Sequence, residues 1–122
     1  MAEPLRFAVN ERATARYTAV IVGNDGVTPL AAATLLTLVL TVYVITAAGT
    51  ETLLRDHQNV LNLNNVTVDG SGNLVWSVQS SDTSLVEAVP FEDHIALFEW
   101  TWADGGGKHE VILTVRNLRL VP

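Results

Sequence analysis

The residues best suited to acid–base chemistry or metal binding are three histidines, His57, His94 and His109. His94 begins one strand of an expected hairpin and His109 begins the other, so their rings would lie at opposite ends of the pair. His57 belongs to a separate, amide-rich segment. Zinc requires three or four convergent His, Cys or carboxylate ligands, and the sequence contains no cysteine. We therefore expect no metal site, and structural or surface positions for all three histidines.

Other patterns that could support catalysis or cofactor binding are incomplete. Residues 69–73 (DGSGN) resemble the start of a calcium loop but lack its downstream glutamate. Residues 105–108 (GGGK) lack the spacing of a phosphate loop, and no serine stands in a Gly-x-Ser-x-Gly motif. No pattern places the carboxylates of Glu87 and Glu92 across a cleft. Because an active site needs several convergent groups, the sequence predicts a protein that is not an enzyme and has no cofactor.

Trp100 and Trp102 are candidates for binding rather than for catalysis. They share one face of an expected strand with Phe98, because successive strand residues point to opposite sides. Paired tryptophans can form a sugar-binding platform or an interface hot spot, whereas a face shared with Phe98 favours packing in a core. Trp102 is nearest the following turn, so we expect it to be partly exposed and assign it to an interface. A carbohydrate-binding module is an alternative function.

The elements that must position these residues are β-strands. Residues 94–102 and 109–121 form an expected hairpin around the glycine-rich turn at 103–108. Further strands are expected at residues 14–22, 36–46, 51–55, 66–68 and 74–78, with a loop at 56–65. About seven short strands without a long helix predict an all-β, immunoglobulin-like antiparallel β-sandwich; a small β-barrel is the alternative. The expected core comprises Leu38, Leu40, Val42, Trp76, Phe98, Trp100, Val111 and Leu113.

Length and charge limit the classes of function. A chain of 122 residues with a net charge of −6 is expected to form one domain, and its basic residues do not cluster as nucleic-acid binding requires. Residues 27–48 contain no charged residue, which raises the possibility of a membrane helix. Their threonines and their period of two favour a strand instead. The first residues lack the pattern of a signal peptide. We expect no membrane or nucleic-acid partner, and synthesis in a cytoplasm.

Two apolar surfaces are predicted to contact partners. Val39, Tyr43 and Ile45 form the second face of the long strand at 36–46, and this face is more apolar than a solvent-exposed one. Residues 1–12 are an N-terminal arm or an edge strand, and residues 13–122 form the single domain. The alternating residues of the arm, which could add a strand to a neighbour, are Leu5, Phe7 and Val9.

From Arg55 onward the sequence resembles small virion structural proteins of tailed bacteriophages. The resemblance is carried by residues 58–62, 64–67, 72–76, 92–94, 98–102, 109–111, 115–118 and 121–122, together with Asp82 and Ala96. It implies a capsid decoration or cement subunit, or alternatively a neck, tail or baseplate subunit, located in the virion after synthesis in the host bacterial cytoplasm. The implied partners are the major capsid protein or neck and tail proteins, and further copies of the chain. The matching residues are folding residues and turns, so no catalytic residue is implied.

Overall fold

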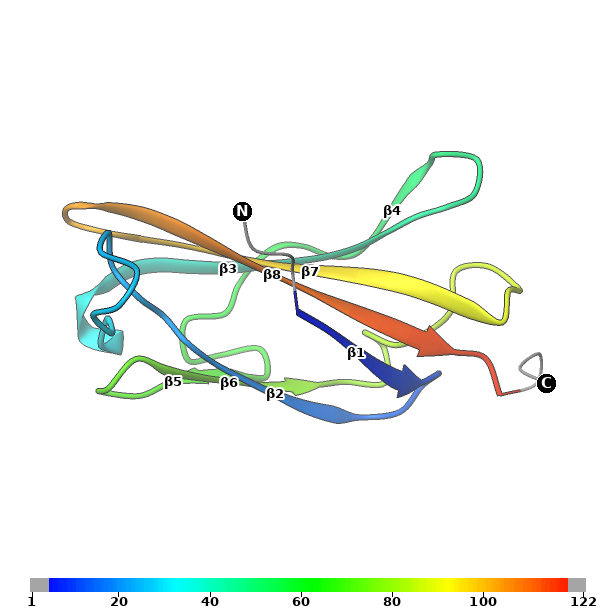
Figure 1. The fold of residues 1–122 in the computed structure, drawn as a ribbon, viewed down its shortest axis with the longest axis horizontal. Coiled ribbons are helices and arrows are strands. Elements are labelled where there is room, and N and C mark those ends of the chain that lie inside the picture. Colours follow the sequence, from blue (N-terminus) through cyan, green and yellow to red (C-terminus); the bar gives the residue numbers. More distant parts are fainter. Residues whose placement is uncertain (1–4, 119–122) are drawn as a thin grey trace.

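The computed structural model describes residues 5–118, apart from the side chains of Leu5 and Phe7. Eight strands form two sheets that lie one above the other in Figure 1. A short 3-10 turn, η1 (Ala32–Thr34), precedes the third strand. The strands are β1 (Leu5–Asn10), β2 (Ala15–Val20), β3 (Leu35–Ile45), β4 (Glu51–Asn59), β5 (Val66–Val68), β6 (Asn73–Val78), β7 (Phe91–Trp102) and β8 (Gly105–Arg116). The predicted all-β sandwich is confirmed, with eight strands in place of about seven.

The strand order is that of an immunoglobulin-like sandwich. The larger sheet has the order β1-β8-β7-β3-β4, and the smaller sheet has the order β2-β6-β5. Strands β3, β7 and β8 thus occupy the places of immunoglobulin strands C, F and G, and β4 extends that sheet as in variable domains. Strands β2, β6 and β5 take the places of B, E and D. The central strand of the larger sheet is β7, which pairs with β8 and β3.

The core lies between the two sheets, and all eight residues expected to form it are buried. Trp76 and Phe98 meet edge to face, with ring centroids 5.6 Å apart. Tyr17 on β2 stacks on Phe98 on β7 with a centroid distance of 6.5 Å. Antibody domains join these two strands by a disulfide, whereas this cysteine-free chain joins them by aromatic packing.

Strand β3 departs from the predicted alternation at its first residues. The pairing with β7 shifts between Leu35 and Thr37, so Leu35 takes the inward position. Leu36, which strict alternation would place on the same face as Leu38, is 66% exposed. From Leu38 onward the inward positions follow the predicted alternation, since Leu38, Leu40, Val42 and Val44 are buried. Thr41, on the other face, is buried as well.

Strand β4 is longer than predicted. It continues to Asn59 through residues expected to form a loop. The register against β3 shifts on both sides of Val42, and His57 has a positive φ of 46°. A β-bulge places an extra residue in one strand and interrupts the alternation of side chains, which is why the sequence pattern did not indicate a strand here.

The N-terminal segment is an edge strand of its own domain. Strand β1 pairs in parallel with β8, from Leu5 opposite Val111 to Asn10 opposite Arg116. The amide of Glu11 continues this pairing by donating to the carbonyl of Arg116 at 2.9 Å. The alternative of a free arm is therefore replaced by a strand held in the larger sheet.

Candidate functional site

A buried ion pair joins β4 to the loop between β6 and β7. The guanidinium of Arg55 donates from Nε to Oδ1 of Asp82 at 2.6 Å and from Nη2 to Oδ2 at 2.7 Å. Arg55 also donates to Gln58 Oε1 and to the carbonyl of Asn64, both at 2.9 Å. Its guanidinium carbon lies 5.9 Å from the ring centre of Trp76. The cation is therefore held by charge, hydrogen bonds and an aromatic face together.

A second buried pair lies at the start of β7 and contacts the same loop. The Nδ1 atom of His94 lies 2.7 Å from the carbonyl oxygen of Asp82, and its Nε2 atom lies 2.7 Å from Oε1 of Glu92. The carboxylate of Glu92 also accepts the amides of Val86 at 2.8 Å and of Glu87 at 2.9 Å. Asp82 thereby connects the arginine to the histidine, through its side chain on one side and its carbonyl on the other.

This polar network holds the fold and has no access to a substrate. The side chain of His94 is fully buried, and those of Glu92 and Asp82 are 5% and 1% exposed. A catalytic acid or base must reach the proton that it transfers, and these side chains face only other protein groups. The network fixes residues 79–87 between the two sheets, because buried ions with satisfied hydrogen bonds hold one geometry.

This buried network was not predicted from the sequence. Glu92 and His94 occupy inward positions of β7, four and two residues before Ala96. An ionisable pair on the buried face of a strand must have hydrogen-bonding partners. The alternation of residues in this strand could therefore have predicted a buried polar network at Glu92 and His94. Arg55 and Asp82 carried no such signal, because their meeting depends on the bulged course of β4.

The exposed feature of most interest is the outer face of the larger sheet, formed by side chains that alternate with the core residues. One register row crosses the whole sheet, from Arg6 on β1 through β8, β7 and β3 to Leu53 on β4. The apolar members of this face, here called the outer face, are Val39, Tyr43, Ile45, Leu53, Ile95, Leu97 and Ile112. Ile45 is 56% exposed and Leu53 is 43% exposed, whereas the other apolar members of the face are half-buried.

Charged side chains surround these apolar residues. Arg6 pairs with Asp93 at 2.7 Å across β1, β8 and β7. Glu110 and Glu51 lie near Tyr43, and both contribute to raising the pKa of its hydroxyl, after the larger effect of burial. An apolar centre with a polar rim is the usual composition of a protein–protein interface.

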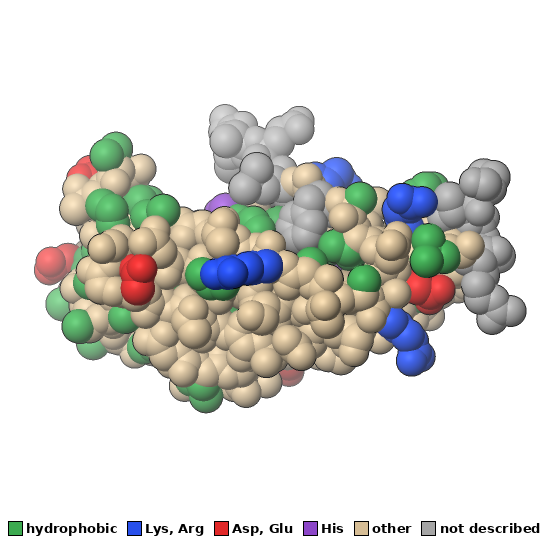
Figure 2. Space-filling view, turned by 90° about the horizontal axis from the view of Figure 1, so that it is seen from below, with side chains coloured by type: hydrophobic (Ala, Val, Ile, Leu, Met, Phe, Trp, Pro, Cys, Tyr) green, Lys and Arg blue, Asp and Glu red, His purple; other side chains and the backbone are tan. Residues whose placement is uncertain are grey.

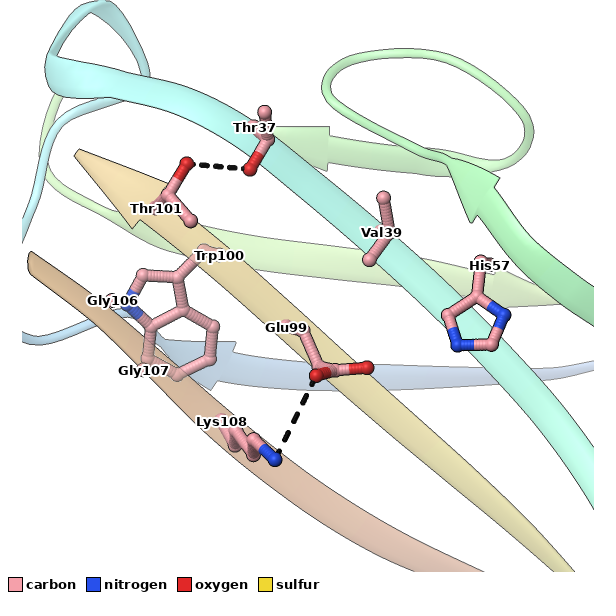
Figure 3. A pocket seen from close by; sticks show the side chains of 9 residues that line it. All are labelled: Thr37, Val39, His57, Glu99, Trp100, Thr101, Gly106, Gly107 and Lys108. Atoms are coloured by element: carbon pink, nitrogen blue, oxygen red, sulfur yellow. Dashed lines mark hydrogen bonds and ion pairs between the residues drawn. The ribbon is translucent and has the colours of Figure 1, made fainter.

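A depression of about 450 Å³ lies at one end of the outer face (Figure 3). Its floor includes Val39, and the hydroxyls of Thr37 and Thr101 are hydrogen-bonded at 2.6 Å. Lys108 and Glu99 form an ion pair at 3.8 Å on one side. His57 projects from β4 on the other side, as Figure 3 shows.

Three titratable side chains line the depression. Its titratable residues are His57, Glu99 and Lys108, and the last two are paired with each other. The hydrogen bond that the His57 ring donates to the carboxylate of Asp56 raises the pKa of His57. Within residues 5–118, no three His, Cys, Asp or Glu side chains are grouped to hold a metal ion.

The opposite face of the molecule differs in character. The outward residues of the smaller sheet include Arg16, Thr18, Thr67, Asn73 and Ser77, all exposed. Figure 2 shows this side as mostly polar, uncharged surface with scattered hydrophobic and charged side chains. The two outer surfaces of the sandwich are therefore unequal, and the larger sheet has the one suited to burial.

The residues assigned to an interface from sequence are found in three environments. Val39 and Tyr43 are half-buried on the outer face with the exposed Ile45. Val9 packs against the edge of the core, and the side chains of Leu5 and Phe7 lie outside the described part of the chain.

Trp102 was expected at the surface and instead belongs to the core, with 9% exposure, beside Trp100 with 6%. Both indoles lie on the inward face of β7, where the loop before η1 and the end of β2 reach them. Both indoles line a shallow depression beside Val20 and Asn24, but their low exposure leaves little ring surface on which a sugar could stack.

In comparisons with known proteins, no protein-family model and no curated protein sequence matches this chain. In the part of the chain that the structure describes, no helix has the length and apolar character needed to cross a membrane.

Proposed function

We propose that this protein is a non-enzymatic structural subunit of a bacteriophage virion, and most simply a capsid decoration or cement protein. A neck, tail or baseplate subunit is the alternative position within the particle. The proposal places the protein in the virion after synthesis in the host bacterial cytoplasm. Its partners are other virion proteins, either the major capsid protein or neck and tail proteins, and further copies of itself.

The observation that carries this proposal is the apolar outer face of the five-stranded sheet. Ile95, Leu97 and Ile112 lie side by side on it, next to Tyr43. These residues are half-buried, and the exposed Ile45 and Leu53 continue the apolar surface on the same face. Exposed apolar area mostly marks a surface that another protein covers. A subunit that is present in many copies gains further from such contacts, because avidity multiplies weak individual affinities.

The buried polar network also suits a structural role. The ion pair between Arg55 and Asp82 and the pair between His94 and Glu92 tie the β6–β7 loop to β4 and β7. These four residues belong to the part of the sequence that resembles phage virion proteins. The resemblance thus includes residues that stabilise the fold. A structural subunit needs such a stable fold to present its contact surfaces.

The test is the number of copies of this chain in purified phage particles, measured by quantitative mass spectrometry against the major capsid protein. A decoration protein is expected at hundreds of copies per particle. Six or twelve copies would instead favour the neck, tail or baseplate position. Absence of the chain from intact particles of a phage that expresses it would overturn the proposal.

A further inference from the structure

We propose that Asp104, in the two-residue turn between β7 and β8, is the site at which this chain modifies itself by converting an aspartate to isoaspartate. The reaction needs only the chain and water. It is favoured where glycine follows the aspartate, because glycine has no side chain to hinder the approach of its amide to the carboxyl group. The inference concerns the chemistry of the folded chain and does not depend on the proposed function.

The reaction proceeds through a five-membered succinimide ring. The amide nitrogen of Gly105 loses its proton and bonds to Cγ of Asp104, and a hydroxyl group leaves Cγ with that proton as water. Water then adds to one of the two ring carbonyl carbons and breaks its bond to the nitrogen. Opening at Cγ restores aspartate, whereas opening at the main-chain carbonyl leaves the chain connected through the side chain. One water is lost and one is gained, so isoaspartate has the mass of the original residue.

The chain contains three aspartate–glycine pairs, which begin at Asp25, Asp69 and Asp104. All three aspartates are exposed and lie outside the strands. Each is followed by the same residue, so neither access to water nor the next residue distinguishes the three pairs. The hydrogen bonds of their carboxylates do distinguish them.

The carboxylate of Asp25 is held by its own turn. Its Oδ2 accepts the hydroxyl of Thr28, and its Oδ1 accepts the amides of Thr28 at 2.8 Å and of Val27 at 2.9 Å. These bonds, that of the hydroxyl first, lower the pKa of Asp25 to about 2. The amide of Gly26 is also occupied, because it donates to the carbonyl of Gly23 at 3.0 Å. Both reacting groups of this pair are therefore engaged.

The carboxylate of Asp69 is held in the same way. Its Oδ2 accepts the side-chain amide of Asn73 at 3.0 Å, and its Oδ1 accepts the main-chain amides of Ser71 at 2.8 Å and of Asn73 at 3.0 Å. These bonds, that of the Asn73 side chain first, lower the pKa of Asp69. The ring forms from the un-ionised carboxyl group, and each unit by which a pKa falls reduces that form about tenfold at a pH above the pKa.

Asp104 lacks such restraints. Within residues 5–118, its carboxylate has no hydrogen bond and no ion pair. Gly105 forms the last pair of the β7–β8 ladder, opposite Trp102. Strand β1 first pairs with β8 at Val111, so no described strand supports this end of β8 from its other side. The end of a ladder opens more readily than its middle, and opening frees the amide of Gly105 to reach Cγ of Asp104.

The product changes the end of the hairpin. Isoaspartate adds one carbon atom to the backbone of a turn whose length sets the register of the two strands. A Cβ atom on Gly105 would lie 3.6 Å from Cζ2 of Trp102, so the closing pair is in contact with this indole. The near-ultraviolet circular dichroism of the tryptophans is therefore expected to change as the product accumulates.

The test is incubation of the purified full chain at about pH 5, where an ordinary aspartate is partly un-ionised. Isoaspartate is measured at each pair by peptide mapping and by enzymatic methylation specific for isoaspartate. It is expected to accumulate at Asp104 about tenfold faster than at Asp25 or Asp69. Asp104→Glu is expected to lose the signal, because its ring would have six members. Asp104→Asn is the positive control, because it forms the same ring with loss of ammonia.

Two further measurements examine the role of the fold. Thr28→Val removes the hydroxyl that holds Asp25, and it is expected to raise isoaspartate at Asp25 while leaving Asp104 unchanged. In concentrated urea at the same pH, the three pairs are expected to react at similar rates, because unfolding removes the hydrogen bonds that separate them.

Three results would overturn the inference. The first is isoaspartate forming at Asp25 or Asp69 as fast as at Asp104 in the folded chain. The second is a preference for Asp104 that persists in urea, because the local sequence and not the fold would then explain it. The third is no isoaspartate at Asp104 under conditions in which Asp104→Asn reacts. None of these results affects the number of copies measured in particles.

Discussion

Arg55 and Asp82 form a two-point ion pair in the interior, with Nε–Oδ1 and Nη2–Oδ2 distances of 2.6 and 2.7 Å. Their side chains are 8% and 1% exposed. Removing one partner of a buried pair leaves an uncompensated charge, which is far more costly than losing an exposed pair. The stability of the β6–β7 loop, and of the strands on either side of it, is therefore expected to depend on this contact.

Asp82→Asn keeps the shape of the side chain and removes its charge. We expect it to lower the free energy of unfolding by about 3–5 kcal/mol, as measured by urea denaturation. The control is Asp93→Asn, since Asp93 pairs with Arg6 at the surface and its loss is expected to cost less than about 1 kcal/mol. Equal losses in the two variants would contradict a special role for the buried pair.

Gly107 provides space for an indole. A Cβ atom at this position would lie 2.7 Å from two ring carbons of Trp100 and 2.8 Å from its Nε1. Gly107→Ala is therefore expected to displace Trp100, lower the melting temperature and change the near-ultraviolet circular dichroism of the tryptophans. Gly70→Ala is the control, because a Cβ atom there meets nothing within 4 Å. An unchanged Trp100 signal in Gly107→Ala would show that the ring is not confined by β8.

His109 should make the fold sensitive to acid. Its ring stacks on Tyr17 at 5.8 Å, and burial lowers its pKa below the ordinary value of 6.5. A histidine with a lowered pKa binds its proton more readily in the unfolded chain, so the free energy of unfolding falls as the pH drops through about 6.5. We expect His109→Gln to lose part of this decrease in denaturation curves between about pH 7.5 and pH 5.

The comparison must be made as a difference between wild type and variant, because other groups titrate in the same range. The pKa of His57 is raised, so His57 contributes the opposite slope, with stability lost as the pH rises through its pKa in the folded state. A variant with the same pH dependence as the wild type would rule out His109 as the source.

Strand β1 should contribute to the stability of its own domain. It covers the β8 edge from Val111 to Arg116, and Val9 packs against the core. We expect deletion of residues 2–10 to lower the melting temperature by several degrees, measured by circular dichroism. Arg6→Ala, which leaves the backbone pairing in place, should change it far less. A truncated chain with the original melting temperature would restore the alternative of an arm that acts on a neighbour.

Local patterns in the sequence were sufficient for most strands and for the core. Alternating apolar residues in β3 and β7 determined that Leu40 and Phe98 face inward, because side chains on a strand have a fixed period of two. Turn residues such as Asp25 and Gly26 marked the ends of strands by local hydrogen bonds and by a φ of 72° at Gly26. These features depend on neighbours in the chain, which a sequence displays directly.

The tertiary structure alone decided the exceptions to these patterns and the long-range contacts. The shift that exposes Leu36 and the bulge that lengthens β4 depend on pairing with partner strands. The burial of Trp102 depends on the loop and strand that pack over its end of β7. Arg55 and Asp82 are 27 residues apart in the chain and meet only when both sheets are in place. Each case is a balance between local preference and packing, and only the assembled sandwich determines which of the two prevails.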